Sequence, residues 1–229
     1  MKLAIIPARG GSKRIPGKNI KNFLEKPIIS YPIEAAIGCG LFDEVMVSTD
    51  CDEIARVSIS YGACIPFIRS EKNSDDDSAT ADVLLEVIND YLNQGKSFDL
   101  ICCIYPTALF ADAEKLRTAY RLLQSSGADA LMPVVPFSYP PLRGLTIVND
   151  YLEMKWPENE KTRSQDIEAI YHDSGQFYFL RTKAFLREKT LFCKKTIPMI
   201  LSELEVQDVD NETDWKLAEL KYLLSYSQV

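Results

Sequence analysis

A loop rich in glycine and basic residues near the start of the chain has the composition of an anion-binding site. Residues 7–19 read PARGGSKRIPGKN and follow a short apolar run at residues 2–6. Gly10 and Gly11 allow backbone N–H groups to approach an anion closely. Like charges gathered in so short a segment repel one another and call for a counter-anion. The loop therefore predicts a phosphate-rich ligand, such as a triphosphate, held by Arg9, Lys13, Arg14, Lys18 and Lys21.

Two standard phosphate-binding motifs do not occur in this loop. The dinucleotide fingerprint GxGxxG is absent from residues 7–19. A Walker A loop requires GxxxxGK[ST], but Gly11 lies one residue too far from Gly17, and Asn19 stands where that motif has its magnesium-binding hydroxyl. A hydrolytic NTPase is therefore disfavoured. A merely solvated basic loop is also less favoured, because paired glycines follow a strand end, where open α/β sheets bind ligands.

A second candidate site lies near the end of the chain, in the sequence VQDVDNETDW. Asp208 and Asp210 stand two residues apart, so both carboxylates point to one side of an extended segment. Two such oxygens, with waters and phosphate oxygens in the remaining positions, suit Mg²⁺. The alternative is helix capping, with Asp210 or Asn211 as the cap and Asp214 in the first turn. Both interpretations can hold together.

The composition is that of an ordinary globular protein. The chain has 229 residues, 46% of them apolar, and 26 Lys and Arg against 33 Asp and Glu give a net charge of −7. This acidic balance argues against a nucleic-acid binder. The apolar runs are far shorter than the ~20 residues that cross a bilayer, and the N-terminus lacks a signal-peptide core. Six cysteines without a CxxC pair, and a single histidine, disfavour zinc and favour a cytoplasmic protein with reduced thiols.

Alternating strands and helices would position the two candidate sites. The predicted strands span residues 2–6, 44–49, 64–68, 100–105, 130–135, 175–180 and 196–201. The predicted helices span residues 30 to about 38–40, 51–60, 80–94, 112–126 and 211–224. Ser30 and Asp50 are predicted as helix N-caps. This order indicates one α/β domain over residues 1–229, with a mainly parallel sheet covered on both faces.

Residues 136–165 interrupt the pattern. The segment has four prolines and no helical period, and Asn149 and Asp150 would join strands at 145–148 and 151–155 into a hairpin. Its apolar content is too high for disorder, which predicts a protruding arm that packs on a second subunit. The alternative is a β-extension folded back on its own domain. The three aspartates at 75–77 predict a solvated loop, and the lone histidine, His172, precedes a strand where it could contact a polar substrate.

Together these segments resemble the CMP-ulosonic-acid synthetases, the CMP-sialic acid synthetase-like cytidylyltransferases. The resemblance covers nearly the whole chain. It rests on IPARGGSKRIPGKN, FDEVMVSTD, YPTALF, SGQFYF and QDVDNETDW. Within the family, SQDIEAIYHDSGQFYF and VQDVDNETDWKLAE resemble the branch that acts on pseudaminic acid. The resemblance implies a Rossmann-like nucleotidyltransferase three-layer sandwich with an extended β dimerisation arm, hence a homodimer.

The resemblance also implies roles for individual residues. The implied catalytic residues are Arg9, Lys18, Asp208 and Asp210, the two aspartates holding Mg²⁺. The implied nucleotide-binding residues are Ala8, Arg9, Gly10, Gly11, Ser12, Lys18, Asn19, Arg69, Ser78 and Thr80. The implied sugar-binding residues are Tyr105, Arg143, Arg163, His172 and Gln176. Tyr105 stands where sialic acid enzymes usually have Gln, and His172 stands near a position that is Arg there, so the sugar pocket should differ from theirs.

The activity implied is transfer of CMP from CTP to the anomeric hydroxyl of a nine-carbon 2-keto sugar acid, with pyrophosphate released. Such a product is an activated sugar for glycan or flagellin glycosylation. The alternatives are a sialic or legionaminic acid synthetase, another sugar nucleotidylyltransferase, or a nucleotide-binding module without turnover, which would need no paired carboxylates. The enzyme interpretations require the basic loop and the two aspartates to face each other across one cleft.

Overall fold

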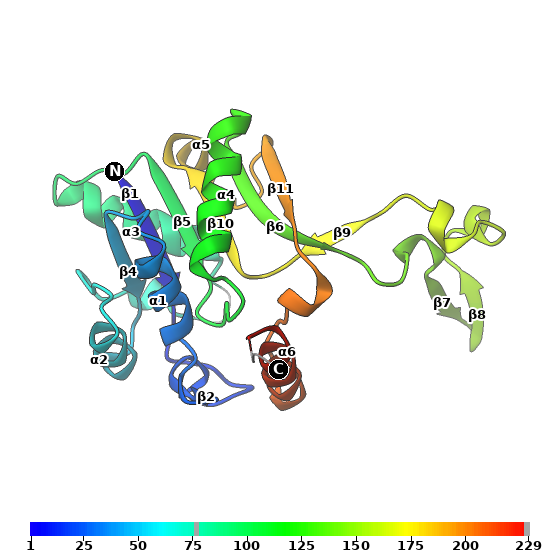
Figure 1. The fold of residues 1–229 in the computed structure, drawn as a ribbon, viewed down its shortest axis with the longest axis horizontal. Coiled ribbons are helices and arrows are strands. Elements are labelled where there is room, and N and C mark those ends of the chain that lie inside the picture. Colours follow the sequence, from blue (N-terminus) through cyan, green and yellow to red (C-terminus); the bar gives the residue numbers. More distant parts are fainter. Residues whose placement is uncertain (76–77, 227–229) are drawn as a thin grey trace.

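The computed structural model describes residues 1–75 and 78–226 and has a mixed seven-stranded sheet at its centre (Figure 1). The strands lie in the order β11-β6-β10-β5-β1-β4, and β9 pairs with the far end of β6. Their bounds are β1 Lys2–Pro7, β4 Glu44–Ser48, β5 Leu100–Ile104, β6 Ala130–Pro136, β9 Tyr171–Asp173, β10 Phe177–Arg181 and β11 Thr196–Ile200. Neighbours pair in parallel except where β10 meets β5 and β6 and where β9 meets β6. The predicted mainly parallel α/β sheet is confirmed.

Helices cover both faces of this sheet because its strands are apolar on both sides. In β1, Ala4 and Ile6 face one core, and Leu3 and Ile5 face the other. The first core contains side chains of α1 (Ser30–Gly38), α2 (Asp52–Ser60) and α4 (Ala113–Ser126). The second contains side chains of α3 (Thr80–Asn93) and α5 (Thr182–Glu188). The result is a three-layer sandwich whose parallel strands end at one edge.

A third cluster joins the N-terminal loop to the C-terminal helix α6 (Glu212–Tyr226). Phe23 lies in a short ribbon of β2 (Asn22–Phe23) and β3 (Lys26–Pro27) and contacts Trp215 and Tyr222 of α6 at ring-centroid distances of 5.6 and 5.7 Å. Ile15 and Val209, from the two candidate sites, belong to the same cluster. Packing of apolar side chains therefore holds the two ends of the chain together.

Several local predictions were wrong. Residues 64–68 are not a strand: they make one bridge, Met46 to Cys64, and Pro66 has no N–H with which to extend a ladder. Ser30 begins α1 but donates its hydroxyl to the Pro27 carbonyl instead of capping. Asp50 does not cap α2, whose N-cap is Cys51. The strand β9 and the helix α5 were not predicted.

The arm extends away from the body of the molecule (Figure 1). Its hairpin consists of β7 (Leu145–Val148) and β8 (Tyr151–Met154) and turns at Asn149 and Asp150, whose φ angles of 49° and 66° are those of a type I′ turn. The predicted hairpin is confirmed, and it does not fold back on its own domain. Its paired residues Ile147 and Leu152 are 75% and 68% exposed. None of the helices in the described part of the chain is long and apolar enough to span a membrane.

Six short 3₁₀ helices lie in the described connections. They are η1 Lys18–Ile20, η2 Glu71–Asn73, η3 Pro141–Arg143, η4 Pro157–Asn159, η5 Ser164–Asp166 and η6 Glu203–Glu205. Of these, η1 and η6 lie beside the candidate site.

Candidate functional site

The basic loop and the acidic segment contact each other, although almost the whole chain separates them. Arg14 donates from Nη1 to Oδ2 of Asp210 at 2.7 Å. Lys18 donates from Nζ to the Val209 carbonyl at 2.8 Å and lies 3.9 Å from Oδ1 of Asp210. The predicted proximity of the loop and the aspartate segment is confirmed. The predicted single cleft between them is not, because neither Asp208 nor Asp210 lines the cavity beside the loop. Cations and carboxylates therefore meet at the edge where the parallel strands β1, β4 and β5 end.

Contacts with the end of β4 hold the loop in shape. The N–H of Ala8 donates to the Ser48 carbonyl at 2.9 Å, and the N–H of Gly10 donates to Oδ1 of Asp50 at 2.8 Å. A Cβ at Gly10 would lie 2.9 Å from the Cβ of Cys51, closer than such atoms approach, so this position requires glycine. Gly11 has open space where its Cβ would be. The two glycines, equivalent in the sequence argument, therefore differ: only Gly10 is needed for packing.

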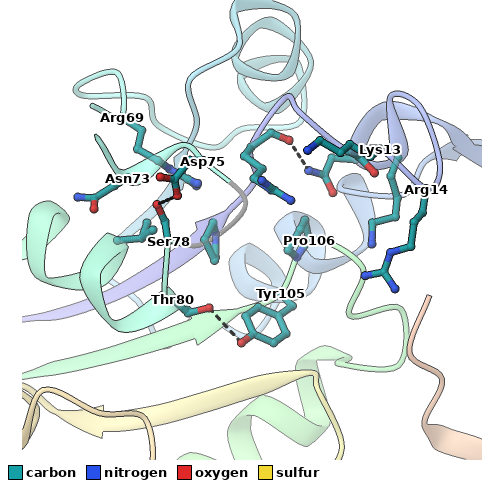
Figure 2. A pocket seen from close by; sticks show the side chains of 15 residues that line it. Lys13, Arg14, Arg69, Asn73, Asp75, Ser78, Thr80, Tyr105 and Pro106 are labelled. Atoms are coloured by element: carbon teal, nitrogen blue, oxygen red, sulfur yellow. Dashed lines mark hydrogen bonds between the residues drawn. The ribbon is translucent and has the colours of Figure 1, made fainter. Parts of the chain in front are cut away.

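A cavity of about 510 Å³ opens between this loop, the start of α3 and the end of β5 (Figure 2). This volume is in the range of small-molecule sites. The predicted residues that line it are Arg9, Ser12, Lys13, Arg14, Lys18, Asn19, Arg69, Ser78, Thr80 and Tyr105. Lys21 does not line it and pairs with Glu212 instead. Ala8, Gly10 and Gly11 are not among the lining residues, and Ala8 is fully buried. The cavity thus brings together most of the predicted nucleotide-binding side chains.

Two buried side chains in the cavity wall, Asn19 and Arg69, could interact further with a ligand. Asn19 donates from Nδ2 to the Arg9 carbonyl at 2.9 Å, while its buried Oδ1 has no hydrogen-bond partner among the described residues. Arg69 is only 6% exposed and donates to the hydroxyl and the carbonyl of Ser48. Burial lowers the pKa of the Arg69 guanidinium, against the opposing charge of Asp50. An anionic ligand with a hydrogen-bond donor would satisfy both side chains.

The ammonium group of Lys18, in the basic loop, lies in surroundings that disfavour its charge. Burial lowers the pKa of its ammonium group, and the carboxylates of Asp210 and Asp208 oppose that shift. Arg14 and Arg9 lower the pKa further by repulsion. A partly desolvated lysine binds an arriving anion strongly, because water screens the interaction little.

Some lining residues were missed from the sequence. Asn73, Asp75, Val83 and Pro106 also line the cavity. Asp75 accepts a hydrogen bond from the Ser78 hydroxyl, so it belongs to the site and not only to a solvated loop (Figure 2). The other two aspartates of that stretch, 76 and 77, lie outside the described residues. Pro106 belongs to the YPTALF motif, but no motif marks Asn73, Asp75 or Val83, which tertiary packing brings to the cavity.

A second cavity of about 520 Å³ adjoins the first, and Tyr105 lines both. The predicted residues His172 and Asp208 line this second cavity. The phenol of Tyr105 lies 3.2 Å from the Thr80 hydroxyl, at the boundary of the two. Gln176 does not line it; this side chain is buried and donates to the Glu205 carbonyl at 2.7 Å.

The two predicted arginines of the arm are not at this site within one chain. Arg143 lies 3.4 Å from the Ser164 hydroxyl, and Arg163 pairs with Asp166 at 2.8 Å. Both are exposed and line neither cavity. If they contact substrate, a second copy of the chain must bring them to it.

The acidic segment both caps α6 and leaves two carboxylates available. Oδ1 of Asn211 accepts from the N–H groups of Thr213 and Asp214, and Oδ2 of Asp214 accepts from those of Asp210 and Asn211. The capping interpretation is therefore confirmed for Asn211 and Asp214. The carboxylates of Asp208 and Asp210 take no part in the cap, so capping does not account for them.

The donor set of the two aspartates fits a magnesium ion held jointly with a ligand. Within residues 1–75 and 78–226, no three His, Cys, Asp or Glu side chains gather to form a metal site by themselves. Two carboxylates plus ligand phosphates are the usual protein share of a Mg²⁺ site. Partial burial of its carboxyl group and, next, the Asp210 charge raise the pKa of Asp208. A cation between the two carboxylates would remove their repulsion.

Comparisons with known proteins agree with this geometry. Residues 3–224 match the family described as Cytidylyltransferase. A pseudaminic acid cytidylyltransferase of Campylobacter jejuni subsp. jejuni serotype O:2 is 39% identical over 225 residues, covering 98% of this chain and 97% of the relative. A CMP-N,N'-diacetyllegionaminic acid synthase of Legionella pneumophila is 33% identical, covering 95% and 94%. The fold is also similar to that of a CMP:2-keto-3-deoxy-manno-octonic acid synthetase solved with CTP, with a TM-score of 0.70 at 16% identity over 99% of both chains.

Proposed function

The chain belongs to the cytidylyltransferase family of nucleotidyltransferases, and from that premise we propose that it transfers CMP from CTP to a nine-carbon 2-keto sugar acid. Pseudaminic acid is the proposed acceptor, because two relatives that carry its name are 38% and 39% identical over nearly the full chain, against 33% for the legionaminic acid synthase. The single observation that carries the proposal is the contact of Arg14 and Lys18 with the segment of Asp208 and Asp210.

The two adjoining cavities support a reaction between two substrates. The first has the basic loop on one wall and suits CTP. The second is polar, is large enough for a sugar acid, shares Tyr105 with the first and is lined by Asp208. Substrates bound side by side in this way react as if in one molecule, which removes much of the entropic barrier. The boundary at Tyr105 is therefore the proposed place of reaction.

The proposed chemistry is an in-line displacement at the α-phosphate of CTP. The anomeric oxygen of the sugar acid forms a bond to the α-phosphorus, and the bond from that phosphorus to the bridging oxygen breaks. Pyrophosphate leaves, and the hydroxyl proton passes to solvent. Arg9 and Lys18 stabilise charge that develops on the phosphates and on the leaving pyrophosphate.

Asp208 and Asp210 are the proposed residues that hold Mg²⁺. When bound, the ion would neutralise charge on the phosphate oxygens and position them. Arg14 orients Asp210 through their 2.7 Å ion pair, and Asn211 and Asp214 fix the backbone of the segment by capping α6. The carboxylates are thus held in place by contacts that do not use them up.

The arm is proposed to pack on a second copy of the chain. Its hairpin lies far from the body of its own subunit (Figure 1). It exposes large apolar side chains, and isolated apolar surfaces of this kind mark interaction sites. Arg143 and Arg163 would then approach the sugar acid of the neighbouring subunit. In this proposal the protein is a homodimer of single-domain subunits, each with its own nucleotide site.

A substrate panel tests the proposed function. The protein is incubated with Mg²⁺, with CTP, UTP or GTP, and with pseudaminic, legionaminic or sialic acid or a sugar 1-phosphate. Pyrophosphate release and product mass are measured. The expected result is a CMP-sugar formed fastest from CTP and pseudaminic acid. Turnover with a sugar 1-phosphate and not with a sugar acid contradicts the proposal, as does CTP binding by calorimetry with no pyrophosphate formed by any pair.

A further inference from the structure

Lys221 of α6 reaches the second cavity and carries a charge that its hydrogen bonds do not neutralise. Its Nζ donates to the carbonyls of Glu203 and Val206 at 3.0 and 2.8 Å, which are the two ends of the η6 turn. Both partners are neutral backbone oxygens. In the described part of the chain the ammonium group forms no ion pair with a carboxylate. An ammonium has three donors, so one remains for a ligand.

The other charged groups of this cavity cannot bind an anion. Its lining includes the carboxylates of Asp173, Glu203 and Asp208. Asp173 already accepts hydrogen bonds from the Gly175 N–H and the Tyr178 hydroxyl. His172 lines the cavity with Nδ1 2.9 Å from the Asp173 carbonyl. Lys221 is thus the single lysine or arginine among the described residues that line this cavity.

We infer that Lys221 binds the carboxylate of the acceptor sugar acid. This inference rests on the proposed function and adds to it the group that distinguishes a sugar acid from a neutral sugar. The two carbonyl contacts hold the long side chain in one conformation before the substrate arrives, so little rotamer freedom is lost on binding. Asp208 lines the same cavity. Seating the carboxylate on Lys221 therefore orients the neighbouring anomeric carbon with respect to the proposed metal site.

Buried oxygens in the same region are consistent with a polar ligand. The hydroxyl of Ser174 lines the cavity, is 2% exposed and has no hydrogen-bond partner among the described residues. A sugar hydroxyl or amide can supply the missing partner. The carboxylate at Lys221 and a polar sugar substituent at Ser174 would together fix the acceptor at two points.

The inference is tested by comparing the sugar acid with its methyl ester. Lys221→Met removes the charge and keeps most of the aliphatic stem. Because a hydrogen bond between charged groups contributes about 1.5–3 kcal/mol, the KM for the sugar acid should rise about 10- to 100-fold. The KM for CTP should change less than about twofold, and the preference of the wild type for the acid over the ester should disappear. Lys221→Arg should restore part of that preference.

Lys216→Met provides the matched control, since Lys216 is an exposed lysine on the same helix and lines neither cavity. It should behave as the wild type in every measurement. If Lys221→Met lowers the melting temperature and raises the KM for CTP but keeps the preference for the acid, Lys221 only supports the fold and the inference is overturned. If the wild type itself does not use a sugar acid, the proposed function fails, and the inference fails with it.

Discussion

The basic loop of residues 7–19 contains charged side chains, and the arm of residues 136–165 contains exposed apolar side chains. The two regions differ in whether other residues of the same chain contact those side chains. The loop's Arg14 and Lys18 are met by the Asp210 segment of the same chain. The arm's Ile147 and Leu152 remain exposed. The proposed nucleotide site is therefore built within one chain, whereas no described residue covers the apolar surface of the arm.

This contrast has a physical basis in packing. The loop is anchored by Ile15, which is 1% exposed in the cluster that also contains Val209 and Trp215. The arm contributes no residue to any of the buried clusters of the described structure. Changes in the loop should therefore alter nucleotide chemistry in the single chain, and changes in the arm should alter association and leave the nucleotide site intact.

The largest effect is expected at Asp208, a proposed metal ligand that lines the second cavity. Asp208→Ala should reduce turnover on the order of 1,000-fold, because loss of a metal ligand removes several kcal/mol of transition-state stabilisation. Calorimetric CTP binding should weaken far less. Near-normal rates of pyrophosphate release would exclude Asp208 as a metal ligand.

The same residue makes a prediction about stability. Partial burial and Asp210 raise the pKa of Asp208, so the ionised carboxylate opposes folding at neutral pH. The sign follows directly: for a raised pKa, the favourable contribution is present below the unfolded pKa and is lost as pH rises through the folded one. Asp208→Asn should therefore melt at the same or a higher temperature than the wild type at pH 7 while being inactive. A clear drop in melting temperature would contradict this.

Lys18→Ala is expected to have the next largest effect, about 100-fold on kcat/KM for CTP. It removes a desolvated charge from the cavity and the contact with the Val209 carbonyl, so both binding and turnover should weaken. Lys26→Ala is the matched control, because Lys26 belongs to the same basic N-terminal region but pairs with Glu34 outside the cavity. Equal kinetics of the two variants would show that the loop is ordinary surface.

Gly10→Ala should weaken CTP binding about tenfold more than Gly11→Ala does. Gly10→Ala forces a Cβ to within 2.9 Å of Cys51 and should lower both CTP affinity and melting temperature, since overpacking typically costs about 1–3 kcal/mol. Gly11→Ala meets no protein atom within 4 Å and should keep the wild-type melting temperature. A loss of CTP affinity in Gly11→Ala without a loss of stability would report direct contact with the nucleotide. Equal melting temperatures of all three proteins would contradict the packing argument.

The smallest effect on the nucleotide is expected from the arm. Ile147 and Leu152 are directly opposite each other in the hairpin, so Ile147→Glu with Leu152→Glu places two charges on the exposed apolar face. Sedimentation velocity at micromolar concentration should show a monomer, while CTP affinity changes less than about twofold because the sites are separate. Thr146→Lys, opposite Glu153 on the other face, should still associate. A wild-type protein that is already monomeric would refute the dimer proposal.

Much of the fold and part of the site were predictable because they depend on local patterns. The helix at Thr80–Asn93 and the hairpin at Leu145–Val148 and Tyr151–Met154 follow from periodicity and turn residues, and the structure has them within a residue of the predicted bounds. The predicted strand at 64–68 was wrong. Its apolar composition favours a strand, but Pro66 lacks the N–H that would extend the ladder. Asp75 and Lys221 could not be identified, since neither belongs to a motif and each joins its cavity through tertiary packing.

The amino-acid sequence by itself determined most of the order of strands and helices, the glycine-containing basic loop and the twin aspartates, because each depends on residues only a few positions apart. Only the tertiary structure decided that Arg14 meets Asp210, that Gly10 and not Gly11 must lack a side chain, and that Lys221 shares a cavity with Asp208. The reason is that contacts across nearly 200 residues arise when the sheet and the aromatic cluster around Phe23 bring the two ends together, and no local spacing encodes that distance.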